Sequence, residues 1–94
     1  MITLPLLLAA LQTIPADSGE VHLRNIRQLT FGGQNAEAYF SRSGRQIILQ
    51  RQVSDSGCDQ QFVMKADGTN LHRVSSGHGR TTCGYFFDND RRIF

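Results

Sequence analysis

Short runs of β-branched and aromatic residues, separated by polar turns, fill the chain after residue 20. This pattern is typical of strands and tight turns, and no segment has the apolar i, i+3, i+4 spacing of an amphipathic helix. The sequence therefore predicts an all-β fold. The strands are expected at Val21–Leu29, Ala36–Phe40, Gln46–Gln52, Gln60–Lys65 and Leu71–Ser75.

Two polar turns between these runs predict hairpins. Asp67-Gly68, within Ala66–Asn70, offers the positive φ that a narrow hairpin requires, because Gly has no Cβ to clash with the backbone. Ser41–Arg45 is a second polar turn, with Gly44 near its end. Consecutive strands are therefore expected to form an antiparallel meander.

The chain also contains an internal repeat. Tyr39–Ile47 has the order aromatic pair, polar turn, Arg, aliphatic residue, and the same order returns 46 positions later (85 minus 39) at Tyr85–Ile93. Upstream, Arg27–Thr30 is echoed by His72–Ser75 at an offset of 45, and glycines follow both segments. A period of about 40 to 45 residues with four strands in each repeat is typical of β-propeller blades.

The repeated residues resemble the WD40-like repeat of TolB-like β-propeller proteins over roughly residues 24–94. In place of that family's Pro-Asp-Gly turn the chain has Arg42-Ser43-Gly44 and then Asp88-Asn89-Asp90. The resemblance implies antiparallel β-propeller blades, with about one and a half repeats in this chain and the missing propeller blades outside it. The residues that carry the repeat and turn motif are Leu29, Thr30, Gly33, Tyr39, Phe40, Ser41, Gly44, Ile47, Asp67 and Gly68.

The amino terminus predicts export. Ile2–Leu11 is an apolar run too short for the roughly 20 residues of a membrane-spanning helix, but it matches the apolar region of about 7 to 15 residues in a secretory signal peptide. We therefore expect residues 1–20 to be a signal peptide or leader, helical in its apolar part, with a linker, and residues 21–94 to be the partial propeller repeats. The alternative is a short apolar segment packed on the body of the protein. Export would place the protein in the periplasm or outside the cell, with no membrane span after removal of the leader.

Cys58 and Cys83 are the only cysteines, and three interpretations remain open. A disulfide would close a loop of about 26 residues and contribute about 3 kcal/mol. The other two are buried free thiols and metal ligands. Metal binding would recruit His78, with Asp59 or His72, but the chain lacks the Cys-x-x-Cys pairs that zinc sites favour.

Composition and motifs restrict the function. A net charge of +2, with basic residues scattered along the chain, argues against a nucleic-acid partner. No Gly-x-Ser-x-Gly elbow occurs, and a Cys83–His78 nucleophile and base would be a chance pairing. We therefore expect a protein that is not an enzyme and needs no cofactor or metal.

The TolB-like resemblance implies a non-catalytic protein-interaction scaffold with protein partners of the cell envelope. In that case the loops around Gln34, Ser54–Asp59 and His78–Thr82 would form the recognition surface, and the repeated aromatic residues would pack between blades. Similar repeats also occur in prolyl-oligopeptidase-like peptidases. The alternative is therefore the propeller portion of such a peptidase, with its hydrolase domain outside this chain.

Overall fold

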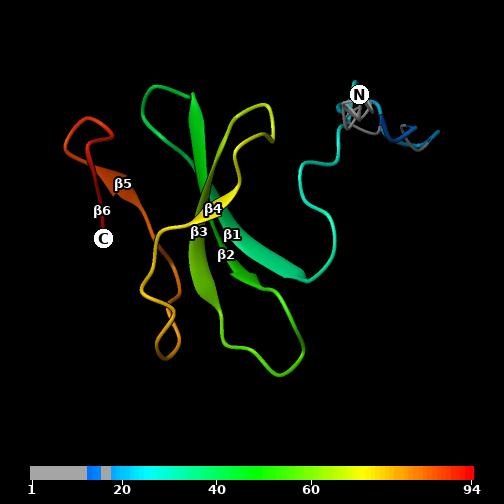
Figure 1. Ribbon diagram of the computed structural model, residues 1–94. Helices are drawn as coiled ribbons and strands as arrows, with labels where there is room; N and C mark the ends of the chain where they lie inside the picture. The colour runs from blue at the N-terminus through cyan, green and yellow to red at the C-terminus, as the bar shows by residue number, and fades with distance from the viewer. Residues whose placement is uncertain (1–12, 16–17) are drawn as a thin grey trace, which may run out of the picture.

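The computed structural model describes residues 13–15 and 18–94. These residues form strands and no helix, so the expectation of an all-β fold is confirmed for the part of the chain described. Figure 1 shows a sheet at the centre, a hairpin beside it that ends at the C-terminus, and an N-terminal segment that leads away on the other side. The six strands are β1 Gln34–Phe40, β2 Gln46–Gln52, β3 Gln60–Lys65, β4 His72–Arg73, β5 Phe86–Phe87 and β6 Arg92–Ile93.

The central sheet is an antiparallel meander in the order β1-β2-β3-β4. The bounds predicted for β2 and β3 match the structure; β1 starts two residues earlier than predicted, at Gln34, and β4 is shorter than Leu71–Ser75. The pairing of Ile47 with Met64 and of Leu49 with Phe62 sets which residues share a face. An irregularity between Ala36 and Tyr39 interrupts the β1–β2 register.

Both faces of the sheet are covered along β2 and β3. On the first face, Ile47, Leu49 and Met64 are buried, and Leu29, Phe62 and Leu71 pack against them. On the second face, Ile48 and Val63 are buried. Burial on both faces explains the uninterrupted apolar run Ile47–Leu49, where a sheet with one wet face would alternate apolar and polar residues.

Residues 79–84, which we term the crossing segment, begin beside the Gln60 side chain, whose Nε2 donates to the Gly79 carbonyl oxygen, and then lie over the second face. The Gln61 side chain donates from Nε2 to the carbonyl oxygen of Thr81, and the Cys83 N–H donates to Gln50 Oε1 at 3.3 Å. A Cβ atom at the buried Gly84 would lie 2.9 Å from Ile48 Cδ1, so the backbone approaches the sheet more closely there than a side chain would permit. The coil after β4 thus closes the second face.

The two predicted turns are confirmed. Gly68 has a φ of 86° in the hairpin between β3 and β4, and the Asp67 carboxylate accepts hydrogen bonds from the N–H and hydroxyl of Thr69. Gly44 has a φ of 71° between β1 and β2, and its N–H donates to the Ser41 carbonyl at 2.9 Å.

The β5–β6 hairpin repeats the geometry of the β1–β2 hairpin. Phe40 pairs with Ile47 in the first hairpin, and Phe86 pairs with Ile93 in the second, so both partners are shifted by the same 46 positions. One pair further from the turn, Tyr85 and Phe94 exchange two backbone hydrogen bonds at 3.0 and 3.1 Å. The repeat seen in the sequence is therefore a repeat of strand register.

The strand predicted at Val21–Leu29 is wrong. The segment contributes only the isolated bridge of Arg27 to Thr13, and Val21 and Leu23 are exposed. A strand is stable only when a neighbour satisfies its backbone, and no described strand runs beside this segment. The apolar run of the predicted leader, Ile2–Leu11, lies outside the described residues. Within the described residues, no helix is long and apolar enough to cross a membrane.

Candidate interaction surface

The two hairpins meet at their turns. The Asp90 carboxylate accepts hydrogen bonds from the backbone N–H of Arg42 at 2.7 Å and of Ser43 at 2.9 Å, and the Arg42 guanidinium donates to Asn89 Oδ1 at 2.9 Å. These hydrogen bonds lower the pKa of Asp90, and the bond from the Ser43 N–H has the largest effect. The sequence suggested only turn formation for Asp88-Asn89-Asp90. Its positive φ values fit that role, but the docking of Asp90 depends on a contact 48 positions away that no local pattern reveals.

Aromatic rings extend this contact along the hairpins. Tyr39 and Tyr85, which occupy equivalent positions of the repeat, lie 4.5 Å apart between ring centroids. Tyr85 also lies 5.9 Å from Phe94, which contacts Phe87 edge to face at 5.4 Å. We term these four residues the aromatic cluster. The Tyr39 hydroxyl donates to the Glu37 carboxylate. This bond is the main cause that raises the pKa of Tyr39, and the neighbouring Tyr85 is the second.

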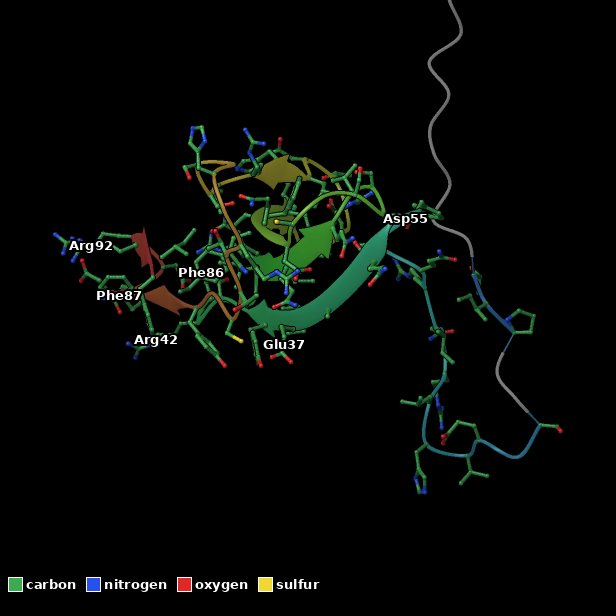
Figure 2. All side chains as sticks on the ribbon, turned by 90° about the horizontal axis from the view of Figure 1, so that it is seen from below. Glu37, Arg42, Asp55, Phe86, Phe87 and Arg92 are labelled. Atoms are coloured by element: carbon green, nitrogen blue, oxygen red, sulfur yellow. The ribbon has the colours of Figure 1, made fainter. Side chains whose placement is uncertain are left out.

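The aromatic cluster remains accessible at one end of the molecule. Phe94 is 73% exposed, and Tyr85 and Phe87 are each more than a third exposed. Figure 2 shows Phe86, Phe87 and Arg92 close to Arg42 at this end, with Asp55 at the opposite end. The expected packing of repeated aromatic residues is therefore present between Tyr39 and Tyr85, whereas Phe40 is 68% exposed.

β6 has a free edge. In the β5–β6 hairpin the hydrogen-bonded backbone pairs are Tyr85 with Phe94 and Phe87 with Arg92. The intervening residue of β6, Ile93, therefore directs its backbone N–H and C=O away from β5. In the first repeat the equivalent residue, Ile47, pairs with Met64 of β3. Among the described residues no strand occupies that position next to β6.

A hollow of about 230 Å³ lies between this edge and the central sheet. Its lining includes Ile93 and Phe94 on one side and Gln61, Val74 and Gly84 on the other. Gln61 is 4% exposed, and its Oε1 atom has no hydrogen-bond partner among the described residues. The hollow is thus largely apolar, with one buried acceptor in its wall.

The motif residues predicted from the sequence fall into structural roles. Ser41 is 4% exposed, and its hydroxyl accepts from the Gln46 N–H. Gly33 has a φ of 66°, and a Cβ there would lie 2.5 Å from the Gln52 carbonyl oxygen. Leu29 packs on the first face, and the Thr30 carbonyl accepts from the Gln28 side chain at 2.8 Å. These residues position the strands and do not converge on one site.

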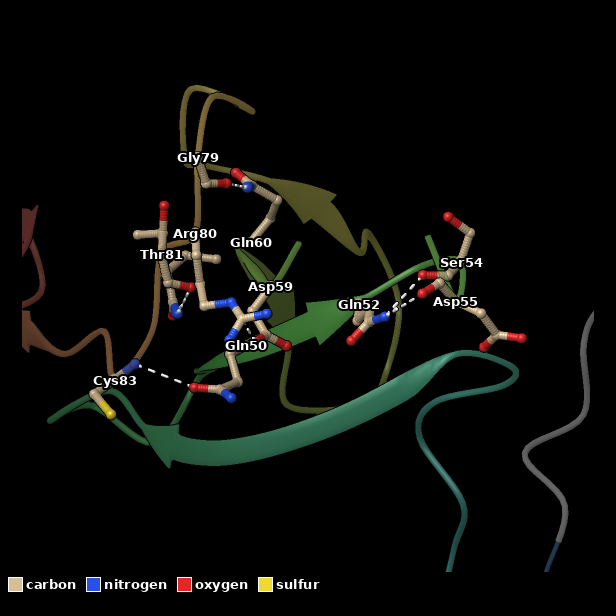
Figure 3. Close-up of polar contacts among 11 residues, drawn as sticks. Gln50, Gln52, Ser54, Asp55, Asp59, Gln60, Gly79, Arg80, Thr81 and Cys83 are labelled. Carbon is tan, nitrogen blue, oxygen red and sulfur yellow. Dashed lines mark hydrogen bonds and ion pairs between the residues drawn. The ribbon is translucent and has the colours of Figure 1, made fainter. Parts of the chain in front are cut away.

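Both cysteines are free, exposed thiols in the structure. The structure therefore contains neither a disulfide between Cys58 and Cys83 nor buried thiols at these two positions. Cys58 lies in the loop after β2, whereas Cys83 lies on the crossing segment, where its N–H donates to Gln50 Oε1 (Figure 3). Within the described residues no three His, Cys, Asp or Glu side chains gather as metal ligands. No hydrogen bond joins the His78 ring to Cys83 in that part of the chain.

The predicted recognition loops are partly occupied by internal contacts (Figure 3). Gln52 Nε2 donates to the carbonyl oxygens of Ser54 and Asp55 at 3.0 and 3.2 Å, which shapes the first loop. The Thr81 N–H donates to the Asp59 carbonyl at 2.9 Å, and Arg80 pairs with the Asp59 carboxylate at 3.6 Å. His78 to Thr82 is therefore only partly a display loop, because residues from 79 onward cover the sheet.

Comparisons of the chain with protein-family models, with curated proteins and with solved structures found no significant match.

Proposed function

We propose that the chain is a non-catalytic protein-interaction scaffold made of β-propeller repeats, of the kind that the TolB-like resemblance implies for an exported protein of the cell envelope. The scaffold binds protein partners through the free edge of β6 and the adjoining aromatic cluster.

The shared register of the two hairpins carries this proposal. Phe40 with Ile47 and Phe86 with Ile93 are related by the same 46 positions, and the two hairpins dock through Tyr39 and Tyr85. Consecutive units that stack by equivalent residues are the defining feature of repeat architectures. The four-stranded meander of the first unit has the strand number and order of a blade.

The free edge of β6 supports a role in binding proteins. Unpaired backbone N–H and C=O groups on an edge strand accept an extended segment from another chain, and exposed aromatic rings beside them add contact area. Ile93 supplies the backbone groups, and Phe94 and Phe87 supply the rings. The first repeat indicates which sequence should pair with β6, because β3 occupies the equivalent position beside β2.

A peptide with the sequence of residues 59–66, which includes β3, tests this proposal. We expect it to bind the full chain with its Met opposite Ile93, as Met64 lies opposite Ile47. Ile93→Pro removes the outward N–H while retaining the β5–β6 hydrogen bonds of Phe94 and Arg92, and it should weaken binding by about tenfold. The measurement is a peptide titration followed by isothermal calorimetry.

Ile93→Val is the matched control, because it keeps the N–H and a β-branched side chain, and it should bind the peptide within about twofold of the wild type. The absence of peptide binding, or equal affinity of wild type and Ile93→Pro, would refute edge recognition as the basis of the function.

A further inference from the structure

A second hollow lies at the opposite end of the sheet from the aromatic cluster and gathers two arginines. It has a volume of about 290 Å³, and its lining includes Arg51 of β2, Phe62 of β3 and Arg73 of β4. Across β2 and β3, Leu49 pairs with Phe62, and Arg51 pairs with Gln60 two residues further along. Across β3 and β4, Phe62 pairs with Arg73. Arg51, Phe62 and Arg73 therefore project from the same face of three neighbouring strands. We term this site the arginine hollow.

Arg51 is fixed in place but incompletely hydrogen-bonded. Its Nη2 donates to the Phe31 carbonyl at 3.0 Å, and its Cζ lies 6.0 Å from the centroid of the Phe62 ring. Its Nε is buried and has no hydrogen-bond partner among the described residues. A buried donor without an acceptor is unfavourable, so a ligand oxygen that displaces the groups covering this N–H and accepts from it would remove that cost.

Arg73 has no side-chain hydrogen bond or ion pair with any described residue. Its guanidinium lies against Gly77, where a Cβ atom would be 2.9 Å from Nη1 and 3.1 Å from Nη2. The glycine thus leaves the space that this orientation of Arg73 requires. The donors of Arg73 remain free in a defined position at the wall of the hollow.

Among the residues that the structure describes, no carboxylate lines the arginine hollow. Asp59, in the adjoining loop, is paired with Arg80 at 3.6 Å, and the other residues of the lining are neutral. Two like charges in the lining of one hollow repel each other, and a bound anion would offset that repulsion. A planar guanidinium binds carboxylate and phosphate oxygens with paired hydrogen bonds, which gives both strength and orientation.

We propose that the arginine hollow binds a small oxyanion group, a carboxylate or a phosphate, between Arg51 and Arg73. The site is separate from the β6 edge, and its existence does not depend on the interaction role proposed above.

The test is a titration of the full chain with inorganic phosphate and, separately, with acetate, at ionic strength held constant with sodium chloride. The Nε–Hε NMR signals of Arg51 and Arg73 should shift saturably with at least one probe, while those of Arg45 should not. The probe that binds more tightly identifies the oxyanion. Constant ionic strength is needed because salt alone screens exposed charges.

Arg73→Gln should weaken binding of that probe by about tenfold, because it removes a positive charge and two parallel N–H donors. The side chain is exposed and lies on an edge strand. Arg45→Gln is the matched control: it removes the same charge from an exposed turn, and its side chain has no partner among the described residues. It should change the affinity by less than about twofold. The absence of a saturable shift with either probe, or equal affinity in Arg73→Gln and wild type, would overturn the proposal.

Discussion

At the scale of single residues, Asp90 joins the two repeats. Its carboxylate accepts from the backbone N–H groups of Arg42 and Ser43, and these bonds hold its pKa below the ordinary value of 3.8. A lowered pKa means that the contact stabilises the docked hairpin at pH values above the ordinary pKa and is lost as the pH falls through the folded-state value. Docking should therefore weaken as the pH falls below the ordinary pKa of 3.8 and be lost below the lower pKa of the docked state.

We predict that Asp90→Ala releases the β5–β6 hairpin from the first hairpin at neutral pH, because both backbone donors lose their acceptor. The nuclear Overhauser effects between the Tyr39 and Tyr85 rings, 4.5 Å apart in the structure, should disappear. In the wild type they should disappear only under acid. Asp55→Asn, in a loop at the opposite end of the molecule, is the control and should retain them. Persistence of these effects in Asp90→Ala would mean that the rings alone hold the hairpins together.

At the scale of elements, the sequence predicts well the strands whose partners are close along the chain. β2, β3 and the turns at Gly44 and Gly68 follow from apolar runs bounded by turn residues, because each hairpin is a local structure. Val21–Leu29 has a similar composition but no neighbouring strand, and it remains a coil. The placement of residues 79–84 over the second face could not be predicted either, since it depends on Gln50 and Gln61, which lie 33 and 20 positions from their partners.

The crossing segment offers a test of how the second face is closed. In Gly84→Ala the new Cβ would lie 2.5 Å from Gln61 Oε1 and 2.9 Å from Ile48 Cδ1. Such overpacking destabilises by about 1 to 3 kcal/mol, so the amide protons of Ile48 and Val63 should exchange with solvent about tenfold faster or more. Thr82→Ala, an exposed position on the same segment, should leave their exchange within about twofold of the wild type. Unchanged exchange in Gly84→Ala would show that the segment does not protect the sheet.

At the scale of the whole molecule, the apolar surface exceeds what the sheet can cover. Phe94, Phe40 and Val21 are 73%, 68% and 76% exposed, while the buried hydrophobic residues among those that the structure describes all lie on β2 and β3. Under the repeat architecture proposed above, a unit buries its apolar faces against neighbouring units, so we expect this sheet and hairpin by themselves to be marginally stable. The same surface that makes the chain suitable for binding partners makes it prone to associate with itself.

We therefore predict that the 94-residue chain melts over a broad range and that its sedimentation depends on concentration. Phe94→Asp should reduce self-association, because it places a charge on the most exposed ring of the aromatic cluster, next to the free edge of β6. Phe40→Asp, outside that cluster, is the matched comparison and should have a smaller effect if association proceeds through β6. Calorimetry and analytical ultracentrifugation measure both quantities. A sharp two-state transition in a monomer would show that the sheet and hairpin are sufficient by themselves, and the expectation of marginal stability would then be wrong.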